Sequence, residues 1–179
     1  EDQGINLLGA PIGSREFVEE EVRKKVEKVR VVTELLPLLQ DPHVEFVLLR
    51  SCLSMPKFSF VLRTTDTTDI VHLLRDFDAT TRDGLARILG TALDDETWQQ
   101  AKMPVSLGGM GLRAAEDHAP TAYAASLLAS QTLLKGLIQT SAGKAILEYG
   151  SWASYTFQSA DFNETLQQLS SLVDDAAHG

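Results

Sequence analysis

The sequence contains a single cysteine, Cys52, and no hydrophobic run near the length of about 18 residues that a membrane-spanning helix needs. A lone cysteine excludes an internal disulfide and favours a reducing compartment, so we expect an intracellular protein, cytoplasmic or nuclear, with no membrane contact. We interpret Cys52 as a small core residue on a helix. No signal peptide is visible and the first residue is Glu1, which indicates a piece of a longer protein or a processed product.

Positive charge is also scarce, since the formal net charge is −9. Residues 1–63 contain nine Lys and Arg against ten Asp and Glu, a net charge of −1, whereas residues 64–179 contain seven against fifteen, a net charge of −8. Phosphate binding needs concentrated positive charge. The second part therefore argues against a nucleic-acid surface, and a local basic stripe is expected only in the first.

The motifs of common catalytic and cofactor sites are missing as well. The sequence has no Gly-x-Ser-x-Gly elbow, P-loop or dinucleotide fingerprint, and its four histidines lack zinc-type spacing. We interpret the three consecutive acids Asp94, Asp95 and Glu96 as a helix N-cap and first turn rather than a metal site. We therefore expect no catalytic residue, no metal, no cofactor and no enzyme activity in the chain as it stands.

Most of the chain instead shows helical periodicity. Ser14 is a natural N-cap for a long helix, because apolar residues recur at steps of three and four between Phe17 and Leu36. After an Asp41-Pro42 cap, the segment 44–53 is apolar almost all round, so we expect that helix at the centre of the fold. These patterns predict a mainly α, compact helical domain.

Later helix boundaries are also marked by single residues. Gly90 is placed to end one helix, and Pro120 is predicted to start an alanine-rich helix that continues to Leu134. Shorter helices are expected over 141–149 and after Asn163.

Two segments interrupt this helical pattern. Residues 4–13 are short and apolar with glycine and proline punctuation, which predicts an extended hairpin at the N-terminus. Residues 104–112 contain three glycines within four positions, which predicts a tight, fixed turn or a close backbone approach, with positive φ at Gly109 or Gly111. We interpret this segment as a structural joint rather than a phosphate loop. The joint residues are Pro104, Gly108, Gly109 and Gly111.

Basic residues cluster in the second half of the first long helix and recur further on. The candidate nucleic-acid-contacting residues are Arg23, Lys24, Lys25, Lys28, Arg30, Lys57 and Arg63, with Arg15 nearby. Two interpretations of the helix cluster are open. It is either a solvated face with Glu20–Lys24 and Glu21–Lys25 pairs, or an edge that faces phosphates.

Three passages together resemble reverse transcriptases of non-LTR (LINE-like) retroelements. Residues 5–14 resemble the segment that ends the palm, where a leucine-glycine turn forms the primer-grip hairpin before the thumb. Residues 104–112 resemble the proline and Gly-Gly-x-Gly-Leu motif that follows the thumb, and residues 122–130 resemble the small-residue helix that comes next. The resemblance covers roughly residues 4–135.

The resemblance implies a thumb and post-thumb region, whose helices in the family lie along the template–primer duplex. It divides the chain into an N-terminal hairpin with thumb-like helices over 1–103 and a glycine joint with C-terminal helices over 104–179, together one compact unit. The palm motif with the catalytic aspartates is absent from the chain. Two functions follow as expectations: a non-catalytic domain accessory to template–primer handling in a longer parent, or a retroelement-derived helical protein-interaction module with no nucleic-acid role. For the isolated chain we expect negligible duplex affinity at physiological salt.

Overall fold

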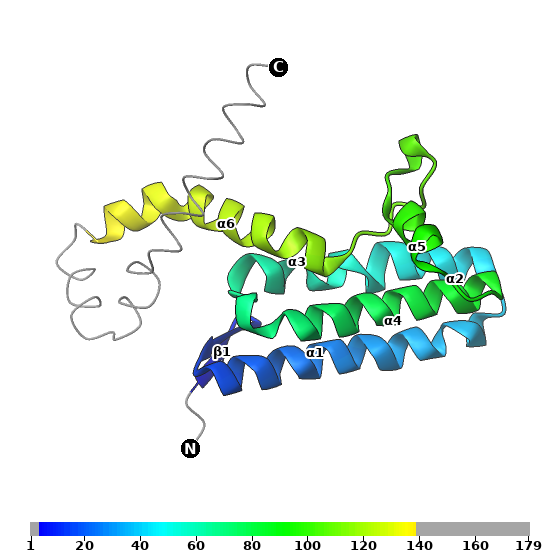
Figure 1. Ribbon diagram of the computed structural model, residues 1–179. Helices are drawn as coiled ribbons and strands as arrows, with labels where there is room; N and C mark the ends of the chain where they lie inside the picture. Colours follow the sequence, from blue (N-terminus) through cyan, green and yellow to red (C-terminus); the bar gives the residue numbers. More distant parts are fainter. Residues whose placement is uncertain (1–3, 139–179) are drawn as a thin grey trace, which may run out of the picture. The chain divides into compact units, whose positions relative to one another are not determined.

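The computed structural model describes residues 4–138, with side chains described up to residue 130. The chain separates into two compact units, Glu1–Tyr123 and Ala124–Gly179. Apart from one N-terminal hairpin, the regular structure of the described residues is helical (Figure 1), so the predicted fold class is confirmed. The glycine-rich segment 104–112 lies within the first unit.

The first unit is a set of helices joined by short turns. The strands are β1 (Gly4–Leu7) and β2 (Ala10–Gly13), and the helices are α1 (Arg15–Leu35), α2 (Pro42–Leu48), α3 (Met55–Thr64), α4 (Val71–Leu89), α5 (Asp95–Lys102) and α6 (Ala115–Ile138). Helix α6 continues beyond Tyr123, the last residue of the first unit. Between them lie the 3-10 turns η1 (Leu36–Leu39), η3 (Thr68–Ile70) and η4 (Val105–Leu107), and the π-helical turn η2 (Leu49–Leu53).

The predicted caps begin and end these helices. The Ser14 hydroxyl accepts from the backbone N–H of Phe17 at 3.3 Å, and the Asp94 carboxylate accepts from Thr97 N–H at 2.8 Å. Each cap satisfies one of the backbone donors that a helix start leaves without a partner. Gly90 ends α4 in the left-handed conformation with φ +67°, as its position in the sequence predicts.

Two groups of buried residues form the core. In the first, α1, α3, α4 and the start of α6 pack together, and the Phe58 and Phe77 rings stack with their centroids 4.4 Å apart. In the second, Leu36, Leu49 and Trp98 pack with other buried residues between the C-terminal end of α1, η2 and α5. The long helices α1 and α4 run side by side and connect the two groups (Figure 1).

The prediction of a central, fully buried helix over 44–53 is wrong. Val44 and Val47 are 41% and 44% exposed, whereas Glu45 is buried. Cys52 is exposed in η2, so its interpretation as a core residue is also wrong. The physical reason is that α2 and η2 bury one narrow face around Leu49, and an all-round apolar sequence does not specify which face that is.

The predicted start of the alanine-rich helix at Pro120 is wrong as well. The helix α6 begins five residues earlier, at Ala115, and Pro120 lies inside it. A side chain from α4 supplies the missing cap, as described below. The helices predicted over 141–149 and after Asn163 lie outside the described residues.

Candidate functional site

An unusual two-residue turn connects the two strands of the N-terminal hairpin. β1 and β2 pair antiparallel with Ile5 opposite Ile12, and the turn consists of Leu8 and Gly9. Both have positive φ, +52° and +93°, the combination that the tightest hairpin turns require. The side chain of Leu8 is 91% exposed at the tip.

Leucine is a poor choice for this backbone conformation. A left-handed conformation costs a residue with a Cβ about 1 kcal/mol or more, and asparagine or glycine normally occupies such a position. Because Leu8 is almost fully exposed, burial of its side chain does not offset that cost. A residue kept in an unfavourable conformation where it adds no packing points to a role for its side chain.

Helices α1 and α3 hold the hairpin turn from two sides. The Lys25 ammonium of α1 donates to the Gly9 carbonyl, and burial lowers the pKa of Lys25. A Cβ on Gly9 would lie 3.7 Å from the Phe60 ring of α3, so that ring borders the turn. Two residues before the turn, in β1, the Asn6 amide donates to Glu21 at 2.9 Å. The turn is therefore fixed in position relative to both helices.

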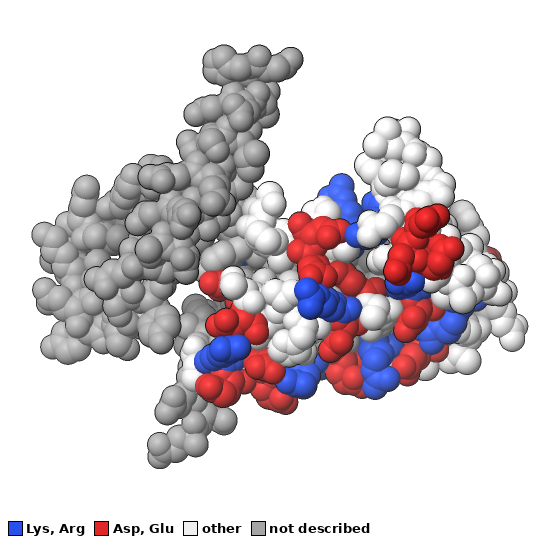
Figure 2. All heavy atoms as spheres, viewed as in Figure 1, with Lys and Arg blue, Asp and Glu red and all other residues white. Residues whose placement is uncertain are grey.

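One flank of α1 carries two of the predicted cations, and both are neutralised within the helix. Arg23 pairs with Glu19 at 2.6 Å and Glu20 at 3.6 Å, and Arg30 pairs with Glu27 at 2.7 Å and Glu34 at 3.0 Å. The Arg30 side chain lowers the pKa of Glu27 by hydrogen bonding. Figure 2 shows the same intermixing of acidic and basic side chains over α1 and α4. This face presents no uniform positive charge to a polyanion.

The other flank of α1 faces the hairpin and carries Lys24, Lys25 and Lys28 at helical spacing. Glu21 is the acid on this flank. It pairs with Lys24 at 2.8 Å, and hydrogen bonds from Lys24 and then Asn6 lower its pKa. The Lys28 ammonium lies near Lys25, whose pKa it helps to lower, and has no carboxylate within ion-pair distance among residues 4–130.

The remaining predicted cations lie on the exposed face of α3. Lys57, Phe60 and Arg63 recur at steps of three, so they occupy one arc of the helix with Phe60 in the middle. Phe60 is 47% exposed beside the hairpin turn. Neither cation has an ion pair among the residues whose side chains the structure describes. We call this surface the hairpin face, and its residues are Leu8, Lys25, Lys28, Lys57, Phe60 and Arg63.

The glycine-rich segment forms a loop between α5 and α6. Gly108 and Gly111 have φ of +81° and +70°, so the prediction of positive φ at Gly109 or Gly111 is confirmed at Gly111 and not at Gly109. Gly109 is required for a different reason, because a Cβ there would lie 2.1 Å from the Met103 carbonyl oxygen. Backbone N–H groups of Met110 and Leu112 both donate to Ala101 O at 3.2 Å. Close backbone approach at Gly109 and these hydrogen bonds therefore constrain the loop.

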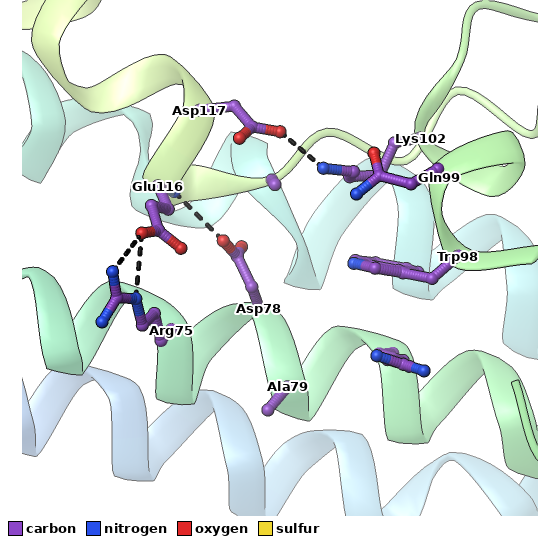
Figure 3. Close-up of a pocket in the computed structure, with 10 residues that line it drawn as sticks. Arg75, Asp78, Ala79, Trp98, Gln99, Lys102, Glu116 and Asp117 are labelled. Atoms are coloured by element: carbon purple, nitrogen blue, oxygen red, sulfur yellow. Dashed lines mark hydrogen bonds and ion pairs between the residues drawn. The ribbon is translucent and has the colours of Figure 1, made fainter. Parts of the chain in front are cut away.

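A shallow pocket of about 310 Å³ lies beside this loop, where α4, α5 and the start of α6 meet (Figure 3). At its centre the Asp78 carboxylate of α4 accepts from the backbone N–H groups of Ala115 at 2.6 Å and Glu116 at 3.0 Å. Asp78 thus caps α6 from another helix. Burial raises the pKa of Asp78 to about 6, against the lowering effect of the two N–H donors.

The other charges of the pocket also hold α6 in place. Arg75 pairs with Glu116 at 2.9 Å, and Lys102 pairs with Asp117 at 2.7 Å (Figure 3). Arg82 instead joins α4 to α5, because it pairs with Asp95 at 2.8 Å. Because each of these charges already has a partner, we interpret the pocket as a clamp on α6 rather than a ligand site. An aspartate among the apolar residues of α4 is the only sign of this clamp in the sequence.

No protein-family model, curated protein or solved structure matches the chain. The likeness to retroelement reverse transcriptases therefore rests on the three sequence motifs. Residues 4–138 contain no group of three His, Cys, Asp or Glu side chains that could hold a metal ion. No helix in this part of the chain is both long and apolar enough to cross a membrane.

Proposed function

We propose that this chain is a non-catalytic helical domain that contacts a template–primer duplex, as the thumb of a longer reverse transcriptase-like protein. The contact surface is the hairpin face. One observation supports this proposal most: Lys28, Lys57 and Arg63 flank an exposed apolar tip and have no carboxylate partner in the described residues.

A polyanion binds more readily to cations that have no carboxylate partner than to cations that are already paired. A cation already paired with a carboxylate must exchange one anion for another, so it contributes little to duplex binding. Arg23 and Arg30 are paired in this way, and they lie on the opposite flank of α1. Of the seven candidates from the sequence, three are paired with carboxylates (Arg23, Lys24 and Arg30) and Lys25 donates to the Gly9 carbonyl. The other three, Lys28, Lys57 and Arg63, lie on the hairpin face and suit phosphates.

The apolar residues of the hairpin face suit the sugars and bases of the same ligand. Apolar side chains at a tip can lie against the minor groove of a duplex, and an aromatic ring can stack on a base. Leu8 and Phe60 are 91% and 47% exposed, and Gly9 lies between them. An apolar tip between flanking cations therefore suits contact with a groove.

The test is fluorescence anisotropy with a labelled RNA–DNA hybrid, in a salt series that starts at about 50 mM. Three phosphate contacts predict a slope of log K against log salt of about −2.7, and binding that is negligible at physiological salt. The variant K28Q/K57Q/R63Q should bind at least about tenfold more weakly, with a slope near zero. The control R23Q/R30Q/R75Q makes the same change in net charge at paired, exposed cations and should bind as the wild type does.

A helical protein-interaction module is the second candidate. It is favoured by the net charge of −8 over residues 64–179, which opposes a polyanion at long range. The same titrations distinguish the two functions. If the wild type does not bind the hybrid at low salt, or if both triple variants bind equally weakly, the duplex proposal fails and the protein-interaction module becomes the better account.

A further inference from the structure

Helix α3 carries only positive charge. Its residues 55–64 include Lys57 and Arg63 and no aspartate or glutamate, whereas each of the other five α-helices of the described residues contains at least one acidic residue. The acidic residue nearest to α3 in the sequence is Asp66, beyond the end of the helix, and its carboxylate already accepts hydrogen bonds from Thr68. In a chain with a net charge of −9, such a helix favours an anionic ligand.

The two cations of α3 lie on either side of an exposed phenylalanine. Lys57, Phe60 and Arg63 follow one another at steps of three, so they are about 60° apart around the helix at 3.6 residues per turn. Phe60 is 47% exposed, in contrast to Phe58, which is 1% exposed and stacks in the core. The Phe60 ring therefore has a free surface between two cations. We call Lys57, Phe60 and Arg63 the α3 arc.

An exposed ring can stack on a base only if that base has a free face. Inside a duplex the neighbouring base pairs cover both faces of each base, so a side chain at the surface reaches only the groove edges, sugars and phosphates. An unpaired nucleotide has free faces, and proteins that bind single strands hold such nucleotides with aromatic side chains beside cations. The α3 arc therefore suits an unpaired nucleotide better than a paired one.

We propose that the α3 arc binds the first unpaired nucleotide of a strand that leaves the duplex. The base stacks on Phe60, and the phosphates on either side of it contact the two cations. This inference rests on the proposed function, because the duplex itself lies against the rest of the hairpin face, around Leu8 and Lys28. The two contacts are continuous, since a Cβ on Gly9 would lie 3.7 Å from the Phe60 ring. The favoured ligand is thus a duplex with a single-stranded extension rather than a blunt duplex.

The test measures the affinity of the 1–179 chain for labelled probes by fluorescence anisotropy at about 50 mM salt. The probes are a blunt RNA–DNA hybrid and the same hybrid with an overhang of about four nucleotides on the DNA strand or on the RNA strand. One of the two overhangs should raise the affinity of the wild type at least about fivefold, the gain expected from one stacked base. An abasic first nucleotide in that overhang keeps every phosphate but offers no base, so most of the gain should be lost.

Two substitutions at Phe60 separate stacking from folding. F60L keeps an apolar side chain but has no ring, so the ratio of overhang to blunt affinity should fall below about twofold. F60W keeps a ring and should retain the gain of the wild type. Circular dichroism checks that both variants are folded. The control L107S removes an exposed apolar side chain outside the hairpin face and should give the wild-type ratio.

The outcomes separate this inference from the proposed function. A wild type that binds the blunt hybrid but gains nothing from either overhang would overturn the inference and leave the proposed function in place. A gain that persists in F60L or with the abasic nucleotide would do the same. Binding of an overhang probe that depends on Phe60, without any binding of the blunt hybrid, would support the α3 arc and contradict the duplex contact. If no probe binds, both proposals fail.

Discussion

The hairpin turn and the glycine-rich loop use positive φ in opposite ways. In the loop, both residues with positive φ are glycines, Gly108 and Gly111, and the side chains that reach solvent belong to residues with ordinary backbone conformations. In the hairpin turn the first residue with positive φ is Leu8, and its own side chain forms the tip. In the loop, glycine therefore meets the needs of the backbone conformation. In the turn, Leu8 occupies a backbone conformation that is unfavourable for it, and its side chain is exposed.

The two regions also differ in the charged group that holds them. Lys25 reaches the hairpin turn from α1, and Asp78 reaches the start of α6, just after the loop, from α4. Burial acts on both groups in the direction that disfavours the charge, lowering the pKa of Lys25 and raising that of Asp78. The partly buried Lys25 and the buried Asp78 therefore each hold a segment by hydrogen bonding to its backbone.

The largest expected effect of a substitution is in the loop. Gly109→Ala places a Cβ 2.1 Å from the Met103 carbonyl, and the surrounding backbone has little freedom to move away. We expect this substitution to lower the free energy of unfolding by about 3 kcal/mol, measured by urea denaturation.

Gly108→Ala is the matched control for this substitution. Gly108 has φ +81°, but a Cβ added there would meet nothing within 4 Å, so only the left-handed conformation is unfavourable, at about 1 kcal/mol. Equal losses for the two variants would show that close approach is not what requires glycine at position 109.

The next effect concerns the pH dependence of the Asp78 clamp. The folded-state pKa of about 6 lies above the ordinary value of 3.8, so the folded protein holds the Asp78 proton more tightly than the unfolded chain does. The stabilisation that comes from this proton is fully present below about pH 4 and is lost as the pH rises through about 6. A difference of this size corresponds to about 3 kcal/mol at most. Asp78→Asn cannot titrate, so its free energy of unfolding should decline less between pH 4 and pH 7 than that of the wild type.

This comparison uses urea denaturation of both proteins across the same pH range. The difference between the two profiles isolates Asp78 from other carboxylates such as Glu27, whose pKa is lowered and whose contribution has the opposite sign. Parallel profiles would show that burial does not raise the pKa of Asp78.

The smallest expected effect is at the hairpin tip. Leu8→Asn places a residue that tolerates positive φ in the turn, and it removes no buried contact because Leu8 is 91% exposed. We expect the free energy of unfolding to rise by about 0.5–1 kcal/mol. A clear loss of stability would instead indicate that Leu8 contributes to folding, and the case for a functional tip would weaken.

Local signals in the sequence predicted much of this fold. The caps at Ser14 and Asp94, the helix end at Gly90, the hairpin and the positive φ of Gly111 all depend on residues close together in the chain. Such features depend on the local backbone conformation, and particular residue types are strongly preferred at each of these positions. The sequence alone therefore predicts them.

Features that depend on contacts between distant elements could not be predicted. The start of α6 depends on Asp78, 37 residues away from Ala115, and nothing near Pro120 reports that cap. The segment 44–53 has apolar residues on every side, so its periodicity does not identify the face around Leu49 that is buried. Which cations are paired could not be predicted either, because pairing depends on side-chain geometry. Lys25, for example, donates to the Gly9 carbonyl of the hairpin.

The proposed function depends most on where a duplex contacts the domain. The direct measurement is photocross-linking of an RNA–DNA hybrid that carries 4-thiothymidine in the primer strand, at low salt, followed by mapping of the modified peptides. Cleavage after Lys and Arg separates a peptide with Leu8 from one with Phe60. The account predicts adducts in both peptides, and these should be lost in K28Q/K57Q/R63Q. Adducts confined to α4, α5 or the glycine-rich loop would contradict it.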